Sequence, residues 1–303
     1  MPAAFAPDPP EQGIYQIAAP LASDTTLFLN SPHSGDHFPA EFLARAQLPR
    51  ETLRRASDLF VDRLFMPATE AGVPMMRALL PRSYVDLNRE PFELDPRLIA
   101  GPLPVDANTR SLRVAGGLGT VPRVIGDQIE IYAGKISLDD ALRRIEQAYV
   151  PYHLRLHREL ALRHQRHGRV VLVDLHSMPS QSGPRPARPL PDLVLGDRFG
   201  ASADPDLVEA AEAAARGLGF RVERNQPYAG GYITEHYGRP ALGWHAFQIE
   251  INRALYMDEQ RLEPHGGFAP VCEALVALIL RLMDFEAYAS RTTALHFSQD
   301  AAE

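Results

Sequence analysis

Short apolar runs rich in β-branched and aromatic residues alternate along the chain with longer segments of helical periodicity. The apolar runs, each expected to form a strand, are "TTLFLN" (25–30), "SYVDLN" (83–88), "RVVLVDL" (169–175), "DLVLGD" (192–197), "FRVERN" (220–225) and "HAFQIEIN" (245–252). Helical periodicity occupies about 50–71, 137–167, 204–217 and 269–285. This alternation predicts an α/β fold.

Helix boundaries are marked by capping residues and by proline. Ser137 is expected to cap the second long helix, with Asp140 three residues further on, and Asp204 to cap the third, with Pro205 in its first turn. Pro151 lies inside the second helix and is expected to kink or split it.

Composition fits one α/β domain spanning residues 1–303. The 303 residues are 45% hydrophobic and 23% charged, enough to bury one substantial core. Two segments fall outside the alternation. We expect 177–192, "SMPSQSGPRPARPLPD", to form a loop or lid, and the polar end "LHFSQDAAE" (295–303) to form a frayed tail.

Charge and cysteine content narrow the class of partner. The net charge of −7 supplies no broad basic surface for nucleic acid, so a small anionic ligand would need specific arginines. Cys272 is the only cysteine, which excludes intrachain disulfides and thiolate zinc clusters and fits the cytoplasm. No apolar stretch has the length of a membrane span, and the N-terminal residues lack the basic segment followed by an apolar one that is typical of a secretory signal peptide. No membrane association is therefore expected.

Two predicted strands run directly into a histidine. His33 in "SPHSGDHFP" and His176 in "DLHSMPS" each follow an apolar run and precede a proline-containing loop. Ligands of α/β sheets bind at the carboxyl ends of strands, which makes both imidazoles candidate site residues. Taken singly, each could equally be a satisfied structural histidine.

Carboxylates are available to join them. A period of two places Gln248, Glu250 and Asn252 on one face of their strand, which is unusual unless that face lines a cleft. In "RRASDLFVDRLF", Asp58 and Asp62 are four residues apart and so are expected on one face of the helix over 50–71. The alternative for Asp58 is a solvated pair with Arg54.

Two neutral histidines and one carboxylate are the ligand set of a catalytic zinc ion with an open position for water. The joint occurrence of both strand-end histidines with a spare glutamate on another strand favours this interpretation.

Six motifs in order, over about residues 28–260, resemble the N-formylglutamate amidohydrolase (N-formylglutamate deformylase) family. They are "SPHSGDHFP", "SDLFVDRLF", "RSYVDLNREPFELDP", "DLHSMPS", "PDLVLGDRFG" and "NQPYAGGYITEHYG…HAFQIEINRALYMDE". The resemblance implies a three-layer fold similar to zinc carboxypeptidases and aspartoacylases, with a mixed, mostly parallel sheet flanked by helices. It also implies zinc-dependent hydrolysis of N-formyl-L-glutamate to formate and L-glutamate, a step of histidine degradation.

Within that family frame, His33 and His176 take zinc-ligand positions and a helical acid takes the third. Asp58 lines up best with the family's helical aspartate; Asp62 lies one turn away, and Asp36 forms a His-x-x-Asp spacing with His33. Asp58 is therefore ranked first.

Glu250 is the expected general base, its alternative being a strand glutamate paired with a cation such as Arg253. The order Asn88-Arg89 is similar to the pair with which carboxypeptidase-like enzymes hold a substrate carboxylate, and a guanidinium can bind it bidentately. The further candidates for substrate binding are Arg82, Arg185, Arg253 and His236. Gly230 and Gly231 are expected either in a loop that approaches the ligand or at the turn of a β-hairpin.

The sequence leaves three rival functions open. The chain could deacylate another N-acyl acidic amino acid, such as N-formylaspartate, because one methyl group discriminates weakly. A serine hydrolase using Ser177 or Ser34 lacks the Gly-x-Ser-x-Gly elbow. A noncatalytic protein that binds acidic amino acids would need the arginines but not the histidines with Glu250.

Overall fold

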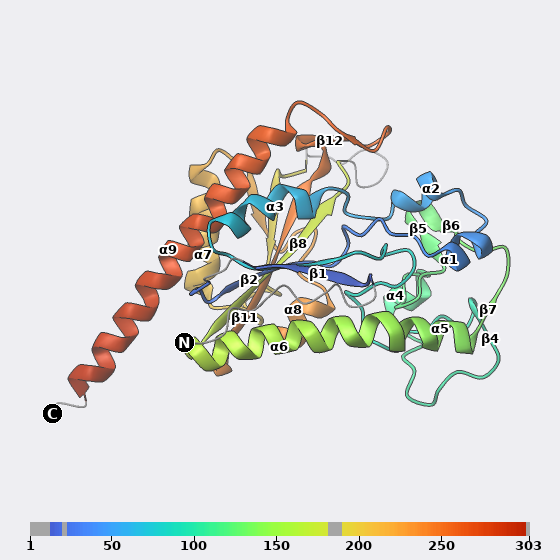
Figure 1. Ribbon diagram of the computed structural model, residues 1–303, viewed down its shortest axis with the longest axis horizontal. Helices are drawn as coiled ribbons and strands as arrows, with labels where there is room; N and C mark the ends of the chain where they lie inside the picture. Colours follow the sequence, from blue (N-terminus) through green and yellow to red (C-terminus); the bar gives the residue numbers. More distant parts are fainter. Residues whose placement is uncertain (1–12, 20–22, 181–189, 301–303) are drawn as a thin grey trace.

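A seven-stranded mixed sheet forms the centre of the molecule (Figure 1). This computed structural model describes residues 13–19, 23–180 and 190–300. The sheet order is β1-β3-β2-β8-β11-β9-β10, and neighbouring strands run parallel except β1 against β3 and β11 against β9. The strands are β1 (Tyr15–Ala18), β2 (Leu27–Ser31), β3 (Met75–Ala78), β8 (Val170–Met178), β9 (Leu193–Gly196), β10 (Val222–Arg224) and β11 (Trp244–Asn252). The expected mixed, mostly parallel sheet is confirmed.

Helices cover both faces of this sheet and give a three-layer architecture (Figure 1). Because side chains alternate along a strand, Phe28 of β2 joins one core, whereas Leu27 and Leu29 join the other. The first core also contains buried residues of α6 (Val150–His167) and α8 (Tyr232–Tyr237). The second contains residues of α3 (Val61–Glu70), α7 (Pro205–Gly217) and α9 (Phe268–Asp300).

Short elements between β2 and α6 form an extension at one end of the sheet, at the right of Figure 1. They are α1 (Ala40–Arg45), α2 (Arg50–Arg54), β4 (Ile99–Ala100), α4 (Leu112–Ala115), β5 (Val124–Ile125), β6 (Ile129–Glu130), β7 (Ile136–Ser137) and α5 (Leu138–Arg144). The buried Arg144 ties this extension together, because its guanidinium donates to Asp140 and to Tyr132. A small hairpin of β12 (Met257–Asp258) and β13 (Glu263–Pro264) precedes α9.

Five of the six predicted strands are present, and the strand predicted over 83–88 is wrong. There the chain forms turns, with hydrogen bonds from Tyr84 N to Pro81 O and from Asp86 N to Thr120 O. Val85 and Leu87 point into the first core, so the apolar signal reflects a buried loop. The strand beside β2 is instead β3, which the sequence pattern missed.

The helix predicted over 204–217 is confirmed, with the Asp204 side chain accepting the N–H of Asp206. Ser137 caps α5 as expected. The helical segment over 137–167 contains a π-helical turn at Ile145–Tyr149, directly before the turn that holds Pro151.

Two helix predictions need correction. The segment 50–71 is two helices, α2 and α3, separated by residues 55–60. The last helix continues to Asp300, so residues 295–300 are helical where a frayed tail was expected. Most of the proline-rich segment predicted as a loop, residues 181–189, lies outside the described residues.

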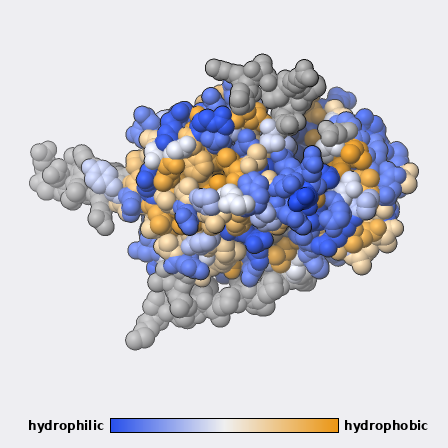
Figure 2. Space-filling view, turned by 90° about the horizontal axis from the view of Figure 1, so that it is seen from above, coloured by the Kyte–Doolittle hydropathy of each residue, from blue (hydrophilic) through white to orange (hydrophobic). Residues whose placement is uncertain are grey.

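In the described part of the chain, every helix is too short or too polar to cross a bilayer. On the face seen in Figure 2, hydrophobic residues form groups separated by hydrophilic ones.

Candidate functional site

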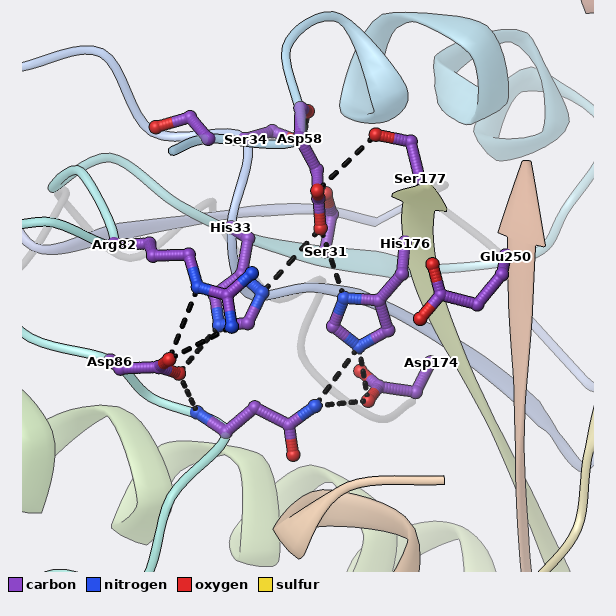
Figure 3. Close-up of polar contacts among 12 residues, drawn as sticks. Ser31, His33, Ser34, Asp58, Arg82, Asp86, Asp174, His176, Ser177 and Glu250 are labelled. Atoms are coloured by element: carbon purple, nitrogen blue, oxygen red, sulfur yellow. Dashed lines mark hydrogen bonds and ion pairs between the residues drawn. The ribbon is translucent and has the colours of Figure 1, made fainter. Parts of the chain in front are cut away.

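Three buried ligand-type side chains meet at the carboxyl ends of adjacent parallel strands. His33 follows β2, His176 lies near the end of β8, and Asp58 lies in the loop between α2 and α3. One ligand atom from each lies within 4.8 Å of the other two, and the three side chains point toward one another (Figure 3). The strand-end histidines predicted from the sequence are therefore brought together.

The position of Asp58 differs from the predicted helical one. Its backbone N–H donates to the carbonyl of His33 at 3.0 Å, and Phe60 adopts a left-handed conformation with φ 67° before α3 begins. Asp58 and Asp62 therefore share no helical face. Asp62 accepts from Arg77 and lies outside the group.

Asp36, the third acid considered, also lies outside the group. Its half-exposed side chain pairs with Arg50 and Arg54 on the surface. Arg54 thus has another acidic partner and does not pair with Asp58 among the described residues.

Each imidazole is held by a buried carboxylate through its Nε2 atom (Figure 3). His33 Nε2 lies 2.8 Å from Asp86 Oδ1, and His176 Nε2 lies 2.8 Å from Asp174 Oδ2. With Nε2 protonated toward these acceptors, both Nδ1 lone pairs face Asp58 Oδ2, at 3.5 Å for His33 and 3.1 Å for His176. Histidines that ligate metals are oriented by such carboxylates.

The donor set fits a divalent cation. His33 Nδ1 is buried and has no hydrogen-bond partner among the described residues, which is costly unless another group is bound there. Nitrogen, nitrogen and carboxylate oxygen are ligands that zinc accepts. The three residues that could hold the ion are His33, Asp58 and His176.

The electrostatics of the group favour positive charge. Burial would raise the pKa of Asp58, but the hydrogen bond from His176 and the close positive charges of His176 and His33 outweigh it and hold this pKa well below its usual value. Burial would lower the pKa of His176, yet Asp174 and Asp58 raise it well above the usual value. The carboxylates that attract a proton to this position would also attract a cation.

Asp86 and Asp174 are residues of the site that the sequence pattern did not identify. Asp174 lies two residues before His176 on the same strand face, so the period of two could have identified it. Asp86 lies in the segment mistaken for a strand. Burial would raise the pKa of Asp86, but Arg82, Arg89 and His33 hold it well below the usual value.

Glu250 lies on β11 in register with His176 of the neighbouring strand, and its side chain extends beside that imidazole (Figure 3). Burial raises the pKa of Glu250 to about 7, which the charges of His176 and Arg82 only partly oppose. Gln248 donates to Glu250 Oε1 at 3.2 Å, so both belong to the predicted polar face. Asn252 bonds instead to backbone groups at the end of the strand.

The site lies in a cavity of about 520 Å³. Its walls include the three buried ligand-type residues, Gln248, Glu250, Asn88 and five arginines: Arg55, Arg82, Arg89, Arg113 and Arg253. A cavity with convergent polar groups and a perturbed carboxylate is the expected form of an active site.

Arg82 and Arg89 both reach Asp86. Arg82 donates twice to Asp86 Oδ2, at 3.1 and 3.0 Å. The Arg89 guanidinium is buried and also donates to the carbonyls of Leu118 and Asn88. Burial lowers the pKa of Arg89 to about 10. Arg89 therefore lines the cavity and also supports the fold of its wall.

Arg253 binds the carboxylate oxygen of Asp58 that does not contact the imidazoles. Its guanidinium donates to Asp58 Oδ1 and to Ser177 Oγ, both at 3.0 Å, and Ser177 donates to Asp58 in turn. Ser34 Oγ contacts Ser31 and the backbone of residues 58 and 62. Neither Ser177 nor Ser34 has a hydrogen bond with an imidazole in the part of the chain described, so the arrangement lacks the base a nucleophilic serine needs.

Asn88 joins the site to the segment before α8. Its Oδ1 accepts the N–H of Ile233, and its Nδ2 lies 3.1 Å from His176 Nε2. A Cβ on Gly231 would lie 2.5 Å from the Asn88 side chain, so only glycine allows this approach. The segment leads into α8, and the alternative of a β-hairpin at Gly230 and Gly231 is wrong.

His236 lines a neighbouring cavity of about 510 Å³ instead of the one with Glu250. The two cavities share Asn88, Arg89, Arg113, Gly230 and Gly231 in their walls. Arg185, a predicted substrate-binding residue, lies outside the described residues.

Two residues at the start of the long α6 segment hold the loop that carries Asp86 and Arg89. Tyr149, at the end of the π-helical turn, donates its hydroxyl to Arg89 O at 2.7 Å. His153 Nε2 lies 2.9 Å from Leu87 O. The loop is thus attached to the helix through main-chain carbonyls.

Comparisons with known proteins identify relatives of this chain. Residues 25–257 match the family model described as N-formylglutamate amidohydrolase. N-formylglutamate deformylase of Pseudomonas aeruginosa is 31% identical over 265 residues, 85% of this chain and 91% of that protein. The corresponding protein of Pseudomonas putida is 32% identical over 206 residues, 67% of this chain and 71% of that protein.

A solved structure shows the same arrangement of elements. The N-formylglutamate amidohydrolase of Ralstonia eutropha JMP134 superposes with a TM-score of 0.85 at 35% identity, over 91% of this chain and 99% of that one. The chain therefore belongs to the N-formylglutamate amidohydrolase family, whose members are hydrolases acting on an amide.

Proposed function

We propose that this protein hydrolyses N-formyl-L-glutamate to formate and L-glutamate with a bound divalent cation, zinc being the metal its donor set suits best. The observation that supports this most is one cavity shared by the His33, Asp58 and His176 group, by Glu250 and by several arginines. The names of the relatives point to the same substrate. Histidine degradation in the cytoplasm is the setting that the family resemblance suggests.

His33, Asp58 and His176 would hold the cation. When bound, it supplies Lewis acidity, which polarises the formyl carbonyl and lowers the pKa of water. Arg253 and Asp86 act as positioning residues, because one fixes Asp58 and the other fixes His33.

Glu250 acts as the general base and then as the general acid. It takes a proton from the water whose oxygen bonds to the formyl carbon, and it gives that proton to the nitrogen as the carbon–nitrogen bond breaks. A pKa of about 7 suits both transfers near neutral pH. The Nη1 group of Arg82 has no partner among the described residues. Arg82 also interacts with the charges of Asp58 and Glu250. It can therefore donate a hydrogen bond to the developing oxyanion.

Arg89 would hold a substrate carboxylate with the N–H groups that its contacts to Leu118, Asn88 and Asp86 leave over. Asn88 acts mainly by positioning, since its side chain already bonds within the protein. His236 and Arg185 are further candidates for substrate binding.

The test is formate release by metal-analysed protein from N-formyl-L-glutamate, N-formyl-L-aspartate and N-acetyl-L-glutamate. We expect N-formylglutamate to be hydrolysed fastest, activity to disappear with a chelator, and zinc to restore it. Faster release from N-formylaspartate would favour the alternative N-acyl substrate. Full activity in metal-depleted protein would refute the metal-dependent mechanism, and no hydrolysis by zinc-loaded protein would favour a binding protein.

A further inference from the structure

One of the arginines in the cavity wall has a guanidinium without a hydrogen-bond or ion-pair partner in the described part of the chain. Arg82 is bonded to Asp86, and Arg253 to Asp58 and Ser177. Arg89 donates to two carbonyls, and Arg55 donates to the carbonyls of residues 259 and 260. By contrast, the Arg113 guanidinium has no hydrogen bond and no ion pair with any residue that the structure describes, although Arg113 lines both cavities.

The backbone that carries Arg113 is well held. It belongs to the single turn α4, where Ser111 Oγ accepts the N–H of Val114. Arg97 donates to the carbonyls of Val114 and Ala115. The free side chain therefore projects from a fixed main chain, and this reduces the entropy lost when it binds a ligand.

The main chain of one residue, Leu118, links Arg113 to Arg89. Leu118 N donates to Arg113 O at 2.8 Å, and Leu118 O accepts from Arg89 Nε at 2.8 Å. The two positive charges also interact, because Arg113 is among the groups that lower the pKa of Arg89, after burial. An anion between the two guanidiniums would relieve this repulsion.

The arginines form a series that leads away from the candidate metal group. Arg82 lines only the cavity that contains the candidate metal group, whereas Arg89 and Arg113 also line the second cavity, whose walls include no member of that group. N-formylglutamate carries one carboxylate next to the amide and a second one three carbons from the nitrogen. A second cation is needed for the second carboxylate, at the end of the series remote from the reacting bond.

We propose that Arg113 binds the γ-carboxylate of N-formylglutamate and so determines specificity for an acidic side chain. This inference rests on the proposed function. It explains how a net-acidic protein can select a dianion.

The test compares Arg113→Gln with wild type on N-formyl-L-glutamate and on N-formyl-L-glutamine, which has an uncharged amide in place of the γ-carboxylate. Loss of one charge-assisted contact should lower kcat/KM for N-formylglutamate about 10- to 100-fold, mainly through KM. The value for N-formylglutamine should change by less than about 3-fold, because no ion pair is lost with that substrate. Equal losses on both substrates, or no loss on N-formylglutamate, would overturn the proposal.

Arg110→Gln is the matched control, because Arg110 is exposed, lies three residues earlier and lines neither cavity. It should match wild type on both substrates. Urea unfolding of Arg113→Gln should also match wild type, since the guanidinium has no partner in the described part of the chain. A clear loss of stability would show that Arg113 stabilises the folded protein, and would overturn the proposal.

Binding separates this inference from the proposed function. Calorimetry with zinc-loaded protein should show L-glutamate binding at least about 10-fold more weakly to Arg113→Gln than to wild type. Equal binding, or no glutamate binding by wild type, would overturn the role of Arg113. Absence of formate release by wild type would instead overturn the deformylase assignment, whatever the calorimetry shows.

Discussion

Asp174→Asn should weaken metal binding although Asp174 is not itself one of the candidate ligands. In the protein, Asp174 Oδ1 accepts from Asn30 Nδ2 at 2.7 Å and Oδ2 lies 2.8 Å from His176 Nε2. Asn30 cannot turn its amide round without loss, because its Oδ1 accepts from the Tyr152 hydroxyl at 2.6 Å. An amide at position 174 must therefore direct its NH₂ group at one of two donors.

The size of the effect follows from these contacts. A hydrogen bond to a charged acceptor contributes about 1.5–3 kcal/mol, roughly twice the value for a neutral one, so His176 loses about 1 kcal/mol even if the amide oxygen faces it. If the NH₂ group faces it instead, the proton of His176 moves to Nδ1 and blocks the lone pair needed for the metal. Together these effects give a loss of about 10- to 100-fold in metal affinity, the range typical for such partners of metal ligands.

The assay is competition for zinc between the protein and a fluorescent chelator, at fixed pH. Asp62→Asn is the matched control, since Asp62 is a buried carboxylate nearby whose partner is Arg77 instead of an imidazole. A cooperative unfolding transition in urea shows that each metal-free variant is folded. Wild-type zinc affinity in folded Asp174→Asn, or an equal loss in Asp62→Asn, would refute the reasoning.

Three other predictions test the site and the core. His33→Ala and His176→Ala should each lose stoichiometric zinc by elemental analysis, and full zinc content in both would exclude this ligand set. Glu250→Gln should retain zinc but lose about 10²- to 10⁴-fold in kcat, and near-normal turnover would assign the base elsewhere. His245 accepts a backbone N–H at Nδ1, and burial lowers its pKa to about 4. Since this lies below the unfolded value of about 6.5, its contribution to stability is complete above that pH and is lost as the pH falls toward 4, by about 2–3 kcal/mol. In urea unfolding at several pH values, the free energy of unfolding should fall less steeply with acid in His245→Gln than in wild type. An unchanged slope would show that His245 does not cause this loss of stability.

The strand-end histidines could be predicted because parallel strands bring their carboxyl ends to one edge, and β2, β8 and β11 are adjacent and parallel. The same reasoning placed Glu250 on a polar strand face, which the register with His176 bears out. The role of each residue in catalysis stays a prediction.

The surroundings of the site could not be predicted, because they depend on loops. Helical periodicity extended through residues 55–60, but Phe60 takes a left-handed conformation and a backbone bond ties Asp58 to His33. The run over 83–88 has the alternation of a strand because Val85 and Leu87 reach the core while Asp86 faces the site. Burial produced the pattern in both cases, and tertiary contacts decided the backbone.

The attachment of the Asp86 loop to the long helix has a consequence for how the substrate range of such a protein can change. Tyr149 and His153 bind the carbonyls of residues 89 and 87, and every amino acid has that carbonyl. A substitution at residue 87 or 89 therefore leaves the carbonyl that accepts this hydrogen bond in place, although it changes the side chain. These two hydrogen bonds hold the loop whichever side chain stands at position 89, so a different side chain can face the cavity there while Asp86 stays beside His33, at the cost of the Arg89 contacts to Leu118 and Asn88.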